Sequence, residues 1–249
     1  MGLPVLNRQI FLFLILFSIA FFLLFSVRNY SNDKNTLSES YITYKTYAEE
    51  TYDRLGTYIP HFKLPKPGTY KLPRIKRIKD HILISENGKL VHLLELKHNK
   101  IAIVSFIYTN CPEKYGCPLA TFVMSQVDSY LYKEKSLRKN VVLISISFDP
   151  ERDTARVMKA YKKLLNPKTE WHFLTTSSMH MLTPVLEDFG QRIQKLYYSN
   201  GRWTGMYRHV LKIFLIDKEN YIRNIYSTGI VSPGLILADV KTLLADNPH

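Results

Sequence analysis

Two apolar runs, at residues 101–107 and 141–148, interrupted only by serines, dominate the pattern of hydrophobic and polar positions along the chain. Strands that are covered on both faces of a sheet have this character, so the pattern predicts two central strands. Between them, apolar residues recur at helical spacing from Leu119 to Leu131. This alternation of strand and helix predicts an α/β fold, with a central mixed, mostly parallel sheet flanked by helices.

Shorter elements complete the predicted domain. Asn87-Gly88 is a strong two-residue hairpin turn, and it predicts an N-terminal β-hairpin over residues 81–96. A second hairpin is expected from strands at 207–216 and 221–226. The remaining predicted elements are a helix after the break at 149–154, a strand at 171–175, a helix at 178–189 and a closing helix at 233–244.

The N-terminal part of the chain differs in character from the rest. Residues 10–27 form an uncharged run of 18 residues, and as a helix they would extend roughly 27 Å, enough to cross the apolar core of a bilayer. No small-x-small cleavage pattern follows, so an uncleaved transmembrane helix is favoured over a signal peptide. The predicted organisation is a short cytoplasmic N-terminus at 1–9, the anchor at 10–27, a polar stalk at 28–59 and a folded domain at 60–249.

The net charge of +13 favours an anionic partner or a membrane surface. Residues 63–79 carry seven Lys or Arg and no acid, which suits a solvated strand or docking onto anionic headgroups or an acidic partner. A two-cysteine site argues for the oxidising side of the membrane. We therefore expect the domain in the periplasm or an equivalent extracytoplasmic space, where nucleic acid is not a partner.

The two cysteines of the chain, Cys111 and Cys117, lie between a predicted central strand and the helix that follows it. This placement is the thioredoxin-like arrangement, and the positive end of the helix dipole favours the thiolate there. The spacing is C-x5-C rather than the C-x-x-C of thioredoxin-like redox motifs. A structural disulfide, a redox pair and a metal site are all compatible with these residues.

One of the eight histidines stands out by its position. His209 begins the apolar stretch HVLKIFLI, and in a parallel sheet that strand can begin beside the cysteine loop. Two thiolates and an imidazole suit Cu(I) and also accept Cu(II), whereas structural zinc usually takes a fourth ligand. Met206 lies close in sequence, either as a transient thioether ligand or as an ordinary loop methionine.

Three stretches together resemble the Sco/SenC family: VSFIYTNCPEKYGCP, ISFDPERDT and RHVLKIFLID. The resemblance covers roughly residues 60–245. It implies a membrane-tethered thioredoxin-like domain that binds one copper ion and assists assembly of the copper centre of cytochrome c oxidase. Such a protein delivers copper to, or reduces the cysteines of, a copper-accepting oxidase subunit or a related copper protein, and is a metallochaperone more than an enzyme.

The resemblance also assigns roles to residues. Cys111, Cys117 and His209 become the metal ligands, and Asp149 becomes either a residue that supports a ligand from behind or a plain turn residue. The family pattern is C-x3-C, so the C-x5-C loop marks a divergent branch. The main alternative is a thiol–disulfide oxidoreductase that uses Cys111 and Cys117 as a redox pair without copper transfer. An anchored binding domain with an inert disulfide and a peroxidase are weaker alternatives.

Overall fold

The computed structural model describes residues 66–228 and 230–246. The predicted cytoplasmic N-terminus at 1–9, anchor at 10–27 and stalk at 28–59 lie outside these residues, so they remain predictions. In the described part of the chain, no helix combines the length and the apolar character needed to cross a membrane.

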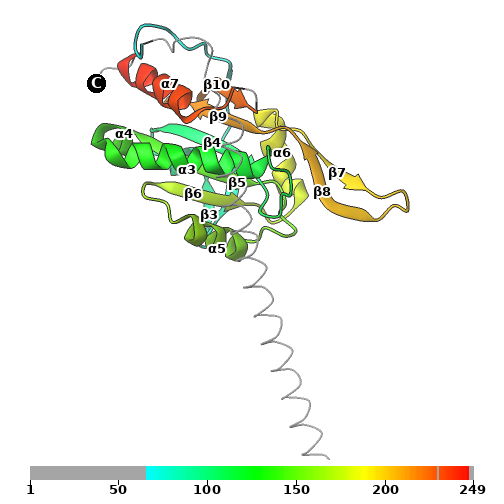
Figure 1. Ribbon diagram of the computed structural model, residues 1–249. Helices are drawn as coiled ribbons and strands as arrows, with labels where there is room; N and C mark the ends of the chain where they lie inside the picture. Colours follow the sequence, from blue (N-terminus) through cyan, green and yellow to red (C-terminus); the bar gives the residue numbers. More distant parts are fainter. Residues whose placement is uncertain (1–65, 229, 247–249) are drawn as a thin grey trace, which may run out of the picture. The chain divides into compact units, whose positions relative to one another are not determined.

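An eight-stranded sheet forms the centre of the domain, in the order β1-β10-β9-β4-β5-β6-β2-β3 (Figure 1). Its strands are β1 (Lys76–Arg77), β2 (Ile82–Ser85), β3 (Leu90–His92), β4 (Ile101–Ile107), β5 (Val141–Ser147), β6 (Trp171–Thr175), β9 (Lys212–Ile216) and β10 (Tyr221–Ser227). The pairs β4–β5 and β5–β6 are parallel, and the other five pairs are antiparallel. The prediction of a mixed sheet is therefore confirmed, but "mostly parallel" is wrong, because only the crossovers through α3 and α5 produce parallel neighbours.

Every residue of β4 and β5 is buried, as their almost wholly apolar sequences predict. The helices are α2 (Leu93–Lys97), α3 (Cys117–Lys133), α4 (Lys135–Asn140), α5 (Ala155–Leu165), α6 (Met179–Phe189) and α7 (Pro233–Asp246). Helix α3 packs on β4 and β5 and also contacts α7. The loop that holds the two cysteines thus lies between a fully buried strand and a helix held on two sides, which fixes its position.

Two of the predicted elements are wrong in part. The hairpin expected over 81–96 exists as β2 and β3, but residues 93–96 are helical in α2. A carboxylate oxygen of Asp80 accepts a hydrogen bond from the backbone N–H of Leu94 at 3.0 Å and so satisfies an N–H at the start of that helix. The strand expected at 207–216 is broken, since β8 ends at His209 and β9 begins at Lys212.

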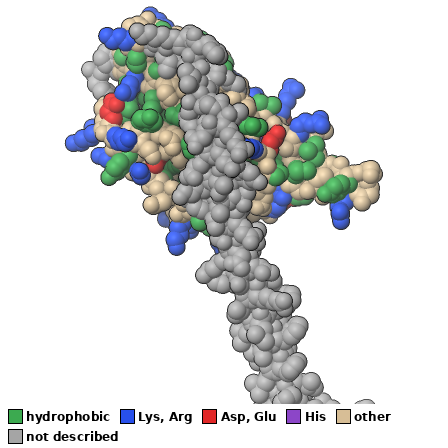
Figure 2. Space-filling model, viewed as in Figure 1, with side chains coloured by type: hydrophobic (Ala, Val, Ile, Leu, Met, Phe, Trp, Pro, Cys, Tyr) green, Lys and Arg blue, Asp and Glu red, His purple; other side chains and the backbone are tan. Residues whose placement is uncertain are grey.

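A second, two-stranded sheet projects from the body of the domain (Figure 1), and the sequence did not predict it. It consists of β7 (Ile193–Tyr197) and β8 (Trp203–His209). The segment 190–211 contains four Lys or Arg and no acid, and Figure 2 shows blue and green side chains on this projecting part. Next to the turn of this hairpin, the indole ring of Trp203 has the Arg152 guanidinium and the Lys195 ammonium each 4.5 Å from its centre. The contact with Arg152 fastens the hairpin to the loop after β5, whereas Lys195 belongs to the hairpin itself.

Candidate metal centre

The cysteine loop leaves the end of β4 and folds back onto the start of α3. The backbone N–H of Cys111 donates to the carbonyl of Tyr108 at 3.3 Å, and that of Gly116 donates to the carbonyl of Glu113 at 2.9 Å. These two turns close the five-residue gap. Cys111 is half-buried in the loop, whereas Cys117 is buried as the first residue of the helix. Both cysteines are free thiols.

His209 reaches the cysteines from the last residue of β8, not from the start of a strand in a parallel sheet. The next strand, β9, is antiparallel to β4, with Ser105 opposite Ile213. In an antiparallel pair the start of one strand lies beside the end of its neighbour, so the residues just before β9 meet the loop that follows β4. The expected proximity is present, but the reason for it is the opposite strand direction.

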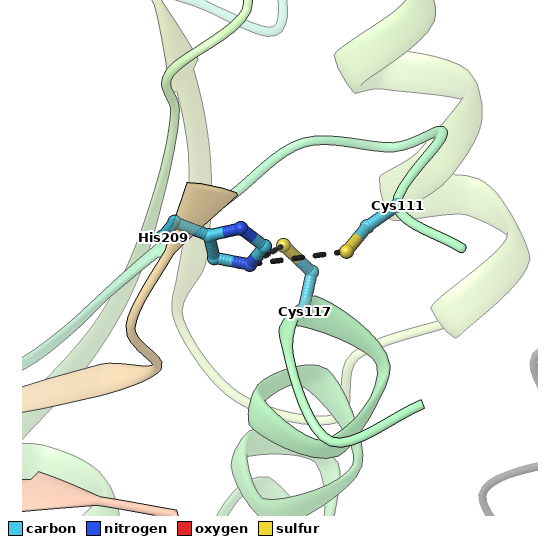
Figure 3. A group of neighbouring side chains, drawn as sticks. All are labelled: Cys111, Cys117 and His209. Carbon is cyan, nitrogen blue, oxygen red and sulfur yellow. Dashed lines mark hydrogen bonds between the residues drawn. The ribbon is translucent and has the colours of Figure 1, made fainter. Parts of the chain in front are cut away.

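The two sulfurs and the imidazole form one compact group (Figure 3). Nε2 of His209 lies 3.8 Å from Sγ of Cys111 and 3.5 Å from Sγ of Cys117, and all three atoms are within 4.8 Å of one another. A metal held at roughly 2.3 Å by sulfur and roughly 2.0 Å by nitrogen in a trigonal arrangement separates S from N by about 3.7 Å. The donor set and its spacing therefore fit a single soft metal ion.

A backbone hydrogen bond and two aromatic rings hold the imidazole of His209 in place. Nδ1 of His209 faces the carbonyl of Tyr207 at 3.1 Å, so Nδ1–H donates there and Nε2 is directed at the sulfurs. The rings of Tyr108 and Phe148 lie 5.6 Å and 5.2 Å from the imidazole, measured between ring centres. Packing and one hydrogen bond thus fix both the orientation and the tautomer of the ring.

The two thiols are electrostatically unlike. The hydrogen bond with Cys117, helped by His209, lowers the pKa of Cys111 to about 4, despite the opposing effect of burial. Burial raises the pKa of Cys117 well above its ordinary value, and the negative charge on Cys111 raises it further. Burial opposes the charge on His209, but its hydrogen bond with Cys111 outweighs this, and the pKa of His209 is raised. At neutral pH the group therefore contains one thiolate and one thiol, and the raised pKa of His209 favours its protonated form relative to an ordinary histidine.

The helix dipole does not decide which of the two thiols is charged. Cys117 occupies the helix N-terminus, yet its burial outweighs the stabilisation that the dipole offers to a thiolate. Cys111 carries the charge instead, because it accepts hydrogen bonds from both neighbours.

Asp149 lies outside this group of three. Its buried carboxylate accepts hydrogen bonds from Nε of Arg152 and, at 3.1 Å, from the hydroxyl of Tyr207. Tyr207 precedes His209 by two residues on β8. Asp149 consequently holds the strand that carries the imidazole and lies outside the group of metal-binding candidates.

Asp153 was missed by the sequence analysis, although it belongs to the same D-P-E-R-D-T stretch. Its carboxylate accepts hydrogen bonds from the backbone N–H of Thr109 at 3.0 Å, from the Thr109 hydroxyl, and from the Ser147 hydroxyl at 2.6 Å. Burial raises the pKa of Asp153 to about 6. The residue ties the start of the cysteine loop to the end of β5. A second acid four positions after Asp149 was the available signal.

A cavity of about 430 Å³ opens beside the centre and has His209 in its wall. The hairpin contributes Met206 and Arg208 to it, and the cysteine loop contributes Pro112 and Glu113. Met206 is 38% exposed, so its thioether is accessible from solvent next to the imidazole. The cavity gives a second molecule a route to the histidine side of the centre.

Comparisons with known proteins agree on one family. The SCO1/SenC family model matches residues 73–245. An SCO2-like protein of Rickettsia felis is 35% identical over 149 residues, which are 59% of this chain and 68% of that protein. An SCO2-like protein of Rickettsia prowazekii is 27% identical over 58% of this chain, and the match spans 66% of the relative's length.

Solved structures agree with this assignment. Copper-bound ScoI of Bradyrhizobium japonicum superimposes with a TM-score of 0.55 at 27% identity, over 68% of this chain and 99% of that one. The mixed α/β, thioredoxin-like architecture is thus shared with Sco structures. With the fold and the family model in agreement, the chain belongs to the SCO1/SenC family.

Proposed function

We propose that this chain is a copper-binding assembly factor that serves the copper centre of cytochrome c oxidase. It holds one copper ion, as Cu(I) or Cu(II), through Cys111, Cys117 and His209. The observation that carries the proposal is the convergence of two sulfurs and Nε2 within 4.8 Å. Thiolate and imidazole both suit copper and zinc, and the chain has no third thiol to complete a typical structural zinc site, which favours copper.

Each residue of the centre has a separate task. Cys111 offers a thiolate at neutral pH and needs no prior loss of a proton. Cys117 adds a buried sulfur from the rigid start of α3. His209 presents Nε2 because Nδ1–H is occupied by the Tyr207 carbonyl. The cavity beside His209 is the side from which a ligand of the accepting protein approaches, so the ion can pass on by exchange of ligands.

The accepting partner that we propose is the copper-binding subunit of cytochrome c oxidase or a related copper protein. The location that we propose is the periplasm or an equivalent extracytoplasmic space, with residues 10–27 as a transmembrane anchor. Support comes from the uncharged run of 18 residues and from a pair of thiols suited to an oxidising compartment.

Thiol–disulfide exchange is a second candidate, favoured by the unequal thiols. The Cys111 thiolate would attack a partner's disulfide, forming a mixed disulfide and releasing one partner thiolate. Cys117 would then attack Cys111, which releases the second partner thiolate and leaves a Cys111–Cys117 disulfide. The partner gains two electrons and this chain loses them. A half-buried, low-pKa cysteine followed by a buried partner suits this order of events.

Copper binding by the purified full-length chain tests the first proposal. The reduced protein is titrated with Cu(I) in competition with a chromophoric chelator, and the same titration is run on Cys111→Ser, Cys117→Ser and His209→Ala. We expect one copper per chain, with each substitution weakening binding. His180→Ala, at an exposed histidine on α6, is the matched control and should bind as the wild type does.

Two outcomes would contradict the proposal. If the wild-type protein retains no copper, the copper-binding proposal is wrong. Unchanged copper affinity in His209→Ala would show that the imidazole is not a ligand. If His209→Ala also reduces a disulfide substrate at the wild-type rate while Cys111→Ser does not, thiol–disulfide exchange becomes the better description.

A further inference from the structure

Gly116 is the residue immediately before Cys117, and its backbone is fixed on both sides. Its N–H donates to the carbonyl of Glu113 at 2.9 Å, and its carbonyl accepts from the N–H of Ala120 at 3.1 Å. The first bond closes the turn of the cysteine loop, and the second begins α3. Gly116 therefore cannot shift without moving the helix start that carries Cys117.

The imidazole of His209 lies directly over this glycine. A Cβ built on Gly116 would stand 2.9 Å from Nε2 and 3.3 Å from Cε1 of His209. Real Cβ atoms essentially never come within 3.0 Å of such a neighbour, so a methyl group at residue 116 and the observed ring position exclude each other. The same Cβ would also be 3.3 Å from the carbonyl oxygen of Glu113, which is a second tight contact.

The histidine has little freedom to yield in place. Its Nδ1–H is bound to the Tyr207 carbonyl, and the rings of Tyr108 and Phe148 pack against it. A side chain at residue 116 must therefore either push Nε2 away from the sulfurs or displace the start of α3. Both movements separate the imidazole from the buried thiol.

We infer that Gly116 is a positioning residue of the metal centre: its missing side chain is what admits Nε2 of His209 to its place beside the two sulfurs. This inference deepens the proposed copper function and rests on it for its metal-dependent test. The five-residue loop between the cysteines would otherwise cover the sulfurs on the side where the histidine enters. Gly116 thus sets the number of ligands that the centre offers, without being a ligand itself.

The test is Gly116→Ala in the full-length chain, with two readouts. In the reduced, metal-free protein, nuclear Overhauser contacts between the α protons of residue 116 and the His209 ring report the close approach; the wild type shows them and the variant loses them. In Cu(I) competition, the variant binds on the order of 10- to 100-fold more weakly, the range found when a residue that positions a ligand is replaced. Gly234→Ala, at an exposed glycine of α7, is the matched control and changes neither readout.

A double-mutant cycle decides whether Gly116 acts through His209. If it does, Gly116→Ala has no further effect on copper affinity in a His209→Ala background. An equal loss in both backgrounds would overturn the inference, because the substitution would then act on the loop or the helix start. Wild-type affinity and retained Overhauser contacts in Gly116→Ala would overturn it as well. If the wild type itself binds no copper, the copper proposal fails, and the Overhauser contacts alone still decide the role of Gly116.

Discussion

The reactivity of Cys111 should be almost independent of pH where an ordinary thiol becomes steadily more reactive. Its pKa lies at about 4, against an ordinary value of 9.0. A group with a lowered pKa stays charged until the pH falls through the folded value. The thiolate of Cys111 is therefore present throughout the neutral range and is lost only as the pH approaches about 4.

The size of the effect follows from two opposing factors. At about pH 6, Cys111 is nearly all thiolate, whereas an ordinary thiol is about 0.1% thiolate, a gain of roughly a thousandfold. Nucleophilicity falls with pKa by a Brønsted factor of about 0.4–0.5, so five pKa units cost roughly 100- to 300-fold. The net gain is only about three- to tenfold at that pH and vanishes near about pH 7. The diagnostic feature is thus a flat pH profile, not a high rate.

The assay is alkylation of the reduced, metal-free protein by iodoacetamide, followed for each cysteine by peptide mass spectrometry. We expect a constant rate at Cys111 from about pH 8 down to about pH 5, and almost no reaction at buried Cys117 under native conditions. Cys117→Ala should move the pH at which the rate falls upward, and more so than His209→Ala, because the hydrogen bond with Cys117 is the larger stabiliser of the thiolate.

Two results would refute this reasoning. A rate at Cys111 that rises about tenfold per pH unit between about pH 6 and 8 would show an ordinary thiol. A larger shift in His209→Ala than in Cys117→Ala would show that the imidazole, and not the second thiol, is the main source of the low pKa.

Two further substitutions test the supports of the centre. Burial raises the pKa of Asp153 to about 6, so its ionisation lowers the stability of the wild type as the pH rises through that value. Asp153→Asn has no such charge. In urea unfolding, its stability relative to the wild type should therefore improve between about pH 4 and 8, by at most about 3 kcal/mol. A difference that is constant with pH would contradict this. Tyr207→Phe removes the hydrogen bond to the buried Asp149 carboxylate and should lower the free energy of unfolding by about 1.5–3 kcal/mol, whereas an unchanged urea midpoint would show that the bond contributes nothing.

The central elements could be predicted because their signal is local. Strands β4 and β5 are apolar at almost every position, and α3 repeats its apolar residues at helical spacing, so sequence alone located them within a few residues. Helix α2 could not be located in the same way. At its start, the backbone N–H of Leu94 donates a hydrogen bond to Asp80, 14 residues earlier in the chain. A contact between residues so far apart has no signature in the local sequence pattern.

The β7–β8 hairpin was missed for a related reason. Its strands are half-exposed and lack a clean alternation of apolar and polar residues. They are held by each other and by Trp203, whose ring packs against Arg152 about fifty residues earlier in the chain. This omission also misplaced His209, which was taken as the start of one long strand and is the end of another.

At the centre, the kinds of residue could be predicted but their physical state could not. The sequence indicated Cys111, Cys117 and His209 as a group because thiols and imidazole share a preference for soft metals. Which thiol is charged depends on burial, and burial depends on the complete fold. The role inferred for Gly116 likewise depends on a ring that arrives from β8, more than ninety positions later in the chain.

Copper binding and thiol exchange make the same demand on Cys117, which must lose a proton that burial holds in place. A bound cation removes the proton by its charge, since a coordinating thiol is deprotonated outright. In exchange, a mixed disulfide at Cys111 removes the neighbouring negative charge that helps to raise the pKa of Cys117. Both routes therefore begin at Cys111 and neutralise its charge before Cys117 can react. The two proposed functions would then compete for one thiolate, and an ion bound at Cys111 would protect the pair from exchange until a partner removed it.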